Sequence, residues 1–218
     1  MNDTDPVARS NHSTVDSSTR RLGAIALAGL LLFAMVAVTV QALRTDLHWQ
    51  DMPLSFYLLN AYGHWLQAAY FALAIALISL GAGYYLALRG GRRSAAPGLL
   101  FACAGIGLCV TALAHSNLPG HAPTLEGFVH GTAAQTAFLC VTVAMLLQSW
   151  WLRTNPRWHP RFPFAFVLAL MCFAAIWVDA LWRGMPRGLE QRLVIVLILG
   201  WLGMAAVWLT KPPRDMSS

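Results

Sequence analysis

Six long apolar runs divide this chain of 218 residues, and their length constrains the fold more than any other feature. A transmembrane helix needs roughly 17–25 predominantly apolar residues to cross a bilayer. Only 11% of the residues are charged, against roughly 25% in a soluble domain, so lipid has to cover much of the surface. The sequence therefore predicts an all-α polytopic membrane protein. We expect a bundle of six transmembrane helices within residues 22–210, with spans at about 22–43, 65–88, 98–114, 128–152, 164–182 and 189–209.

Both ends of the chain are polar. Residues 1–21 are rich in Ser, Thr, Asn and Asp and show no apolar periodicity, which predicts a disordered tail. Residues 211–218 form a second polar tail. Arg20 and Arg21 resemble the basic start of a signal peptide, but the first apolar run has 22 residues, and the apolar part of a signal peptide has roughly 7–15. We therefore expect the first helix to remain in the mature protein.

A polar segment from Arg44 to His64 separates the first two runs. Residues 53–61 have the character of a short interfacial helix. Trp and Tyr are enriched at the depth of the lipid headgroups, and we expect four aromatic residues of this region there: Trp49, Tyr57, Tyr62 and Trp65.

The basic residues predict the orientation of the bundle. Of the 15 Lys and Arg residues, 11 lie in the segments 1–21, 89–97, 153–162 and 211–218, which share one side of a six-span protein. The positive-inside rule then places both termini in the cytoplasm. Short basic runs between apolar segments are the pattern of a membrane protein, so nucleic acid is not an expected partner. The excess of Arg and Ala over Lys points to a bacterial protein, and we expect the inner membrane.

Polar residues gather on the outward side of this predicted bundle. The central stretch HSNLPGHAPTLEGFVH, residues 115–130, carries three histidines and one glutamate between two apolar runs. Polar side chains at membrane depth cost a few kcal/mol each, so they are generally paired or functional. The candidate cluster consists of Ser55, His64, His115, Asn117, Glu126, His130, Asp179, Gln191 and Arg192.

Three stretches resemble the bacterial domain-of-unknown-function 998 family. They are LSFYLLNAYGHWLQAAYFALAIALISLG at the second run, HSNLPGHAPTLEGFVHGTAAQTAF at the fourth and RGLEQRL at the sixth. The resemblance covers roughly residues 22–210 and implies a six-span membrane bundle. The family is distantly similar to eukaryotic six-span membrane proteins of the Frag1 kind, which is an analogy of fold only. The resemblance implies no established activity.

Single residues carry this resemblance. The residues that match the family's pattern are Ser55 before the second run, Gly127 and His130 in G-x-x-H, and Gly188, Leu189, Gln191 and Arg192 in G-L-x-Q-R. The family's motif after the third span tends to end in Asp, whereas this chain reads AHSN and offers Asn117. Any role of an ionised carboxylate at that position is therefore in doubt for this chain.

Two local arrangements follow from helical spacing. Glu126 and His130 are four residues apart and lie on one helix face if the helix begins by Thr124, a suitable N-cap residue. Asp179 lies about one turn from the end of the fifth run. It either pairs with Arg183, four residues later, or turns into the bundle and meets His130 or Arg192.

A metal site is one reading of the histidines. His64, His115, His130 and Asp179, with His121, could gather around zinc, which binds imidazole and carboxylate. No H-x-x-x-H or H-E-x-x-H motif supports this, no histidine pair is spaced for haem, and no elbow motif accompanies Ser55 or Ser116. The four cysteines lie singly inside apolar runs and predict neither disulfides nor a thiolate site: Cys103, Cys109, Cys140 and Cys172.

The span centres contain few polar groups and no proline, which argues against a proton or solute carrier. The leading hypothesis is an outward-facing polar pocket that binds a membrane lipid or small amphiphile without catalysis. One alternative is a metal-dependent hydrolase of lipid. Another is a structural partner of a membrane protein or of a second copy, in which the small residues of the third span would form the contact.

Overall fold

The computed structural model describes residues 6–59, 61–88, 94–117, 120, 122–182 and 184–211, and for residues 6–14 it describes the backbone alone. These residues form six long helices and two short 3-10 helices, with no strand among them. Arg89, Arg92, Arg93 and Arg214, which support the predicted orientation, lie outside the described residues. The elements are α1 (Pro6–Leu43), η1 (Leu54–Leu58), α2 (Gly63–Ala87), α3 (Ala96–Leu113), α4 (Leu125–Leu152), η2 (His159–Arg161), α5 (Phe162–Leu181) and α6 (Arg187–Thr210).

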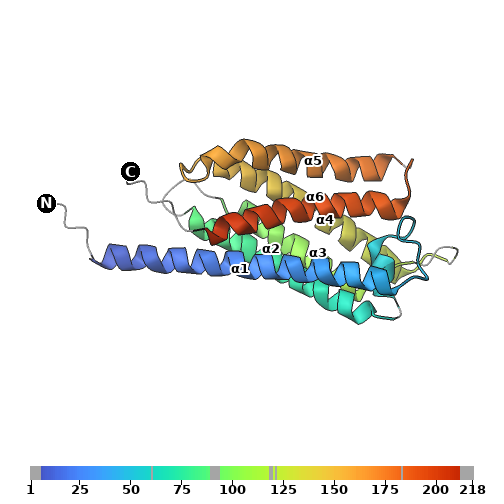
Figure 1. The fold of residues 1–218 in the computed structure, drawn as a ribbon. Helices are drawn as coiled ribbons and strands as arrows, with labels where there is room; N and C mark the ends of the chain where they lie inside the picture. The colour runs from blue at the N-terminus through green and yellow to red at the C-terminus, as the bar shows by residue number, and fades with distance from the viewer. Residues whose placement is uncertain are drawn as a thin grey trace.

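The predicted fold class is confirmed. All six long helices are long and apolar enough to cross a membrane. Each packs against the next in the chain, and α6 closes the ring against α1 (Figure 1). We call the end where α1 begins and α6 ends the terminal end of the bundle. The opposite end, which holds η1 and the connections between α3 and α4 and between α5 and α6, is the cap end (Figure 1).

The first helix differs from the prediction. α1 begins at Pro6, so residues 6–21, which we expected in a disordered tail, are helical in the structure. No Gly or Pro interrupts the chain between Pro6 and Leu22, and a helix that is already formed extends at little cost through residues that do not break it. At 1.5 Å per residue, its 38 residues measure about 57 Å. This exceeds a ~30 Å hydrocarbon layer, so α1 continues beyond the membrane at the terminal end.

The segment between α1 and α2, with described residues 44–59 and 61–62, folds over the cap end of the bundle, and we call it the cap segment. It contains η1 where the sequence predicts an interfacial helix, but Tyr57 is not at a lipid-facing position, because its side chain is completely buried. Its hydroxyl donates to the carbonyl of Leu47, 3.4 Å away. Trp49, Tyr62 and Trp65 are exposed.

The small residues of α3 are used inside the chain. A Cβ on Gly105 would come within 3.2 Å of the carbonyl oxygen of Ala74 on α2, and one on Gly107 within 3.0 Å of that of Ala133 on α4. Ala104 is fully buried. This face therefore packs α2, α3 and α4 together within the chain, and a contact with another membrane protein stays a prediction.

Candidate functional site

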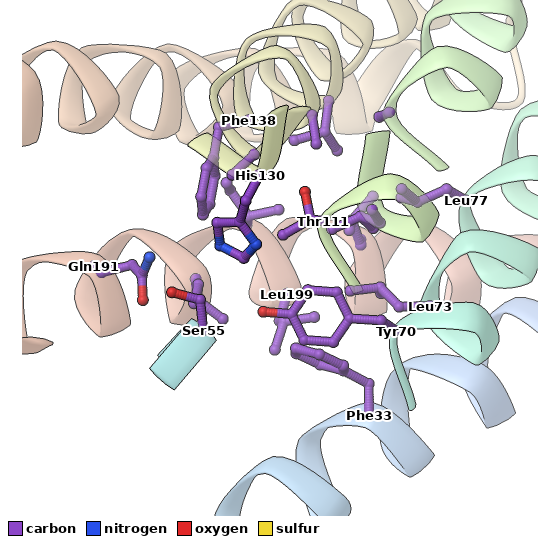
Figure 2. A pocket seen from close by; sticks show the side chains of 18 residues that line it. Phe33, Ser55, Tyr70, Leu73, Leu77, Thr111, His130, Phe138, Gln191 and Leu199 are labelled. Carbon is purple, nitrogen blue, oxygen red and sulfur yellow. The ribbon is translucent and has the colours of Figure 1, made fainter. Parts of the chain in front are cut away.

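A narrow cavity lies inside the ring of helices, near the cap end. Its volume is about 90 Å³, and α1, α2, α3, α4, α6 and η1 all contribute to its wall. Most lining residues are apolar. Three polar side chains from separate elements meet at one place: Ser55 of η1, His130 of α4 and Gln191 of α6 (Figure 2).

The cavity is elongated along the bundle. On α4 its lining residues run from His130 to Val141, and the eleven steps of helical rise between them correspond to about 16 Å. The three polar side chains lie at the cap end of the cavity. The deeper wall includes Leu73, Leu77 and Leu202. The cavity therefore has a polar end and an apolar body, which is the chemical pattern of an amphiphile.

His130 presents a hydrogen-bond acceptor to the cavity. The side chain is only 4% exposed, and Nδ1 lies 2.8 Å from the carbonyl oxygen of Ala114 at the end of α3. A carbonyl can only accept, so Nδ1 carries the proton. In the neutral ring, Nε2 is then an acceptor. The ring lies among the cavity-lining side chains, near Thr111 (Figure 2).

Gln191 presents donors. Its Oε1 accepts a hydrogen bond from the backbone N–H of Leu54, 2.7 Å away. This bond fixes which end of the amide is oxygen and leaves the NH₂ group with its two donors. Ser55 adds a hydroxyl, which can donate and accept. No Lys, Arg, Asp or Glu lines the cavity, so the polar end is suited to an uncharged hydroxyl or carbonyl group.

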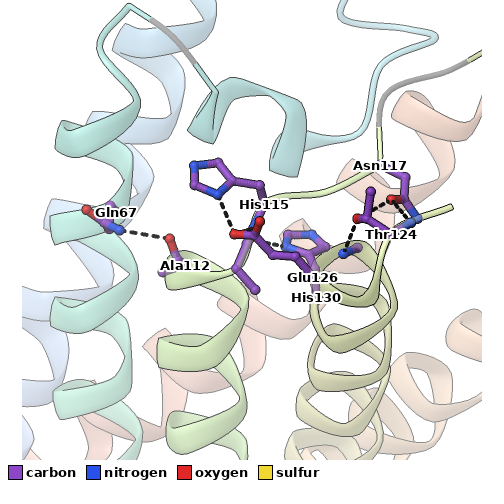
Figure 3. Close-up of polar contacts among 9 residues, drawn as sticks. Gln67, Ala112, His115, Asn117, Thr124, Glu126 and His130 are labelled. Carbon is purple, nitrogen blue, oxygen red and sulfur yellow. Dashed lines mark hydrogen bonds and ion pairs between the residues drawn. The ribbon is translucent and has the colours of Figure 1, made fainter. Parts of the chain in front are cut away.

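Asn117 and Thr124 order the start of α4. Thr124 is the N-cap residue, as predicted, and its Oγ1 accepts from the N–H of Gly127 at 3.0 Å. Asn117 Oδ1 accepts from both the N–H and the hydroxyl of Thr124, at 3.0 and 2.8 Å (Figure 3). A Cβ on Gly127 would lie 2.1 Å from Asn117 Oδ1, so any larger residue there would displace the Asn117 side chain. Asn117 thus has a structural role that needs no ionised carboxylate.

His115 and Glu126 form an exposed side-chain pair next to the N-cap residue Thr124. His115 Nδ1 lies 2.5 Å from Glu126 Oε1, which also accepts from the backbone N–H of His115 at 2.9 Å (Figure 3). Glu126 therefore pairs across the α3–α4 connection, whereas His130, one turn later on the same helix, is buried at the cavity. Neither His115 nor Glu126 lines the cavity.

Arg192 connects the cap segment to α1 and α6 through hydrogen bonds. Its Nε donates to Gln41 Oε1 at 2.5 Å, and its Nη1 donates to the carbonyls of Met52 and Gly188, both at 2.8 Å. A Cβ on Gly188 would lie 2.6 Å from the carbonyl oxygen of Gln50. The start of α6 therefore approaches the cap segment closely, which brings Gln191 and Ser55 to the same cavity.

Arg44 holds the other side of the cap segment. It makes a two-pronged ion pair with Asp46, with both N–O distances 2.7 Å, and donates to the carbonyl of Leu59 at 2.7 Å. The hydrogen bonds from Arg44 lower the pKa of the Asp46 carboxyl, and the same bonds raise the pKa of Arg44. Burial raises the pKa of the Tyr57 hydroxyl.

Asp179 is placed differently from the prediction. It is exposed and lines an open groove of about 530 Å³ between α4, α5 and α6, together with Arg187 and Glu190. His130 and Arg192 bind other partners, so the expected contact of Asp179 with them is wrong. Arg183, its other predicted partner, lies outside the described residues. The groove and the cavity share Phe138 and Gln191 as lining residues.

The candidate metal ligands do not meet. Among the described residues, no three His, Cys, Asp or Glu side chains are grouped to hold a metal ion. His64 is exposed, with its ring beside that of Trp65, and His121 lies outside the described residues. No hydrogen bond joins Ser55 to His130 in this part of the chain, although both line the cavity.

Sequence reasoning missed several cavity and cap residues. Tyr70 and Thr111 line the cavity within apolar runs, and Phe33 closes it from α1. Gln41, the partner of Arg192, is a polar residue in the last turn of α1. A polar residue close to the end of an apolar run was the available signal for Thr111 and Gln41. Nothing in the sequence distinguishes Phe33 from other apolar residues.

The ring of six apolar helices defines the class: this is a multi-pass membrane protein, with a cavity enclosed by five of its helices. The chain belongs to the family described as protein of unknown function (DUF998), whose model matches residues 27–208. No curated protein and no solved structure matches the chain.

Proposed function

We propose that this protein binds an uncharged single-chain amphiphile of the membrane in the cavity at His130. The observation that carries the proposal is that Ser55, His130 and Gln191 lie together at one end of a long apolar wall that contains no Lys, Arg, Asp or Glu. The head of the ligand, a hydroxyl or carbonyl, would contact His130, Ser55 and Gln191, while its chain lies along α4.

The size of the cavity limits the ligand. An apolar cavity of about 150 Å³ accommodates benzene, and this one measures about 90 Å³. As it stands, the cavity therefore takes the head and only a short part of one thin chain. A longer chain requires the helices to move apart, and ring systems of the sterol type are excluded. The shared residues Phe138 and Gln191 suggest a lateral route to the lipid through the groove between α4, α5 and α6.

A photoreactive hexadecanol tests the proposal. The purified protein is labelled in detergent, and the modified peptides are identified by mass spectrometry. We expect labelling of α4 and α6 at cavity-lining residues. Ala134→Leu places a larger side chain into the cavity wall and should remove this labelling, whereas Thr132→Leu, on an exposed position of the same helix, should retain it. Equal labelling of both variants would overturn the proposal.

The proposal includes a location and an orientation. The distribution of basic residues supports a bacterial inner membrane with both termini in the cytoplasm, which puts the polar end of the cavity at the outward face. Reporter fusions at the C-terminus test this. Green fluorescent protein should fluoresce there and alkaline phosphatase should stay inactive, and the reverse pattern would contradict the orientation.

A further inference from the structure

A second set of polar and aromatic residues lies at the terminal end, far along the bundle from the cavity. The connection between α4 and α5 carries Arg157 and Arg161 on either side of Trp158. The guanidinium carbons lie 4.6 and 5.0 Å from the Trp158 ring centre, and Arg161 also lies 5.2 Å from the ring of Trp208 on α6. We call Arg157, Trp158 and Arg161 the Arg–Trp cluster.

Two donors of this cluster have no acceptor. Nε1 of Trp158 and Nη1 of Arg161 are both buried and make no hydrogen bond. The Trp158 side chain is completely buried, against Tyr84 with 5.6 Å between ring centres. A buried donor that is left unpaired destabilises a folded protein. Two such donors in side chains that contact each other indicate that an acceptor binds beside them.

The cluster is also short of negative charge. Neither of the two ion pairs in the described part of the chain involves Arg157 or Arg161. Arg157 donates to the backbone carbonyl of Lys211 at 2.7 Å, which supplies no counter-charge. Burial lowers the pKa of the Arg157 guanidinium, and the charge of Arg161 lowers it further, while Asp16 on α1 acts in the opposite direction. The site therefore favours an anion.

The position of the Arg–Trp cluster indicates that the anion belongs to a lipid headgroup. The cluster lies where α4 ends and α5 begins, with Trp208 of α6 beside Arg161 and with Trp150 in the last turn of α4. Trp residues beside basic residues at the end of transmembrane helices mark the depth of the lipid headgroups. A guanidinium group binds phosphate oxygens in a two-pronged geometry that matches its fork.

We propose that the Arg–Trp cluster binds the phosphate group of an anionic phospholipid at the terminal end of the bundle. Arg157 and Arg161 contact the phosphate oxygens, and Trp158 Nε1 supplies a further donor beneath them. The two guanidinium groups exceed the single charge of a phosphodiester, so a headgroup without a compensating ammonium is preferred. This site does not depend on the cavity at His130.

Native mass spectrometry of the full-length protein in detergent tests the site. The probes are phosphatidylglycerol and phosphatidylcholine with identical acyl chains. We expect the wild type to bind phosphatidylglycerol about tenfold more tightly, because the two guanidinium groups repel the choline ammonium of phosphatidylcholine. The double variant Arg157→Gln/Arg161→Gln should bind both lipids equally. Arg187→Gln, which removes a charge at the cap end, should keep the preference.

Trp158→Phe is the second variant, because it keeps the ring and removes only the Nε1 donor. It should weaken the binding of both lipids several-fold while the protein stays folded, because both lipids present the phosphate to which Nε1 donates. Equal binding of the two lipids by the wild type, or the same loss in Arg187→Gln, would overturn the proposal. Displacement of phosphatidylglycerol by an equal concentration of inorganic phosphate would show a soluble-anion site and overturn the lipid assignment.

Discussion

Arg192 provides the sharpest test of how the cap is held on the bundle. It is the residue that connects α6 with the end of α1 and with the cap segment at Met52. If these bonds position η1, the contributions of Arg192 and Gln41 to stability cannot be independent. A double-mutant cycle with Gln41→Ala and Arg192→Ala measures their coupling.

The expected magnitudes follow from the contacts. Gln41→Ala removes one hydrogen bond to a charged donor, worth about 2 kcal/mol. Arg192→Ala removes three hydrogen bonds, but it also removes a partly buried charge whose Nη2 has no acceptor. Its net cost is therefore about 3 kcal/mol. Because both variants lose the same 2.5 Å bond, the double variant should lose about 3 kcal/mol, and the coupling energy should be about 2 kcal/mol.

The assay is reversible unfolding in mixed detergent micelles, followed by circular dichroism or by the fluorescence of the tryptophans. Thr39→Ala provides a matched control. Thr39 is an exposed residue of the same helix, and its hydroxyl donates to the backbone carbonyl of Met35 within that helix. A cycle of Thr39→Ala with Arg192→Ala should be additive within about 0.5 kcal/mol. If the effects of Gln41→Ala and Arg192→Ala were also additive within about 0.5 kcal/mol, the reasoning would be refuted.

Three further predictions concern the surroundings of the cavity. His130→Ala should lower the free energy of unfolding by about 1 kcal/mol, because it leaves the half-buried carbonyl of Ala114 without its hydrogen-bond donor. The exposed His64→Ala should change the free energy of unfolding by less than about 0.5 kcal/mol in the same titration. Thr124→Ala should cost about 1 kcal/mol through loss of the N-cap, and an unchanged midpoint would contradict that role. The pKa of Asp46 is lower in the folded state, so its stabilising effect is present above about pH 4 and is lost as the pH falls through the folded-state pKa. The stability difference between wild type and Asp46→Asn should therefore shrink in acid, and a difference that grows instead would exclude the ion pair as its cause.

The fold class was predictable because lipid imposes a simple rule on the sequence. Runs of about 20 apolar residues have no alternative to transmembrane helices, and six such runs gave six helices. The helical start of α1 was not predictable from composition. Residues 6–21 have few apolar side chains, and their helix depends on continuity with the span that follows.

The candidate site was predictable in its chemistry and only partly in its geometry. Ser55, His130 and Gln191 were on the predicted polar side, and the structure brings them to one cavity. Periodicity could not separate them from His115 and Glu126, which are equally polar but pair at the surface. That distinction depends on the path of the α3–α4 connection.

Tyr57 illustrates the same limit. A tyrosine in a polar segment between two spans normally belongs to the membrane interface. Here the cap segment folds inward, because Arg44 and Arg192 bind its backbone carbonyls at Leu59 and Met52. Long-range contacts of this kind leave no pattern in a single sequence.

The most direct measurement of the central claim is a crystal structure of the wild-type protein purified with its native membrane lipids and grown without any added single-chain lipid. The account predicts continuous density that begins within hydrogen-bond distance of His130 Nε2 and extends along α4 toward Val141. The lipid extracted from the same crystals should be an uncharged single-chain amphiphile. A cavity closed by its own side chains, or a metal ion bound to His130, would contradict the account.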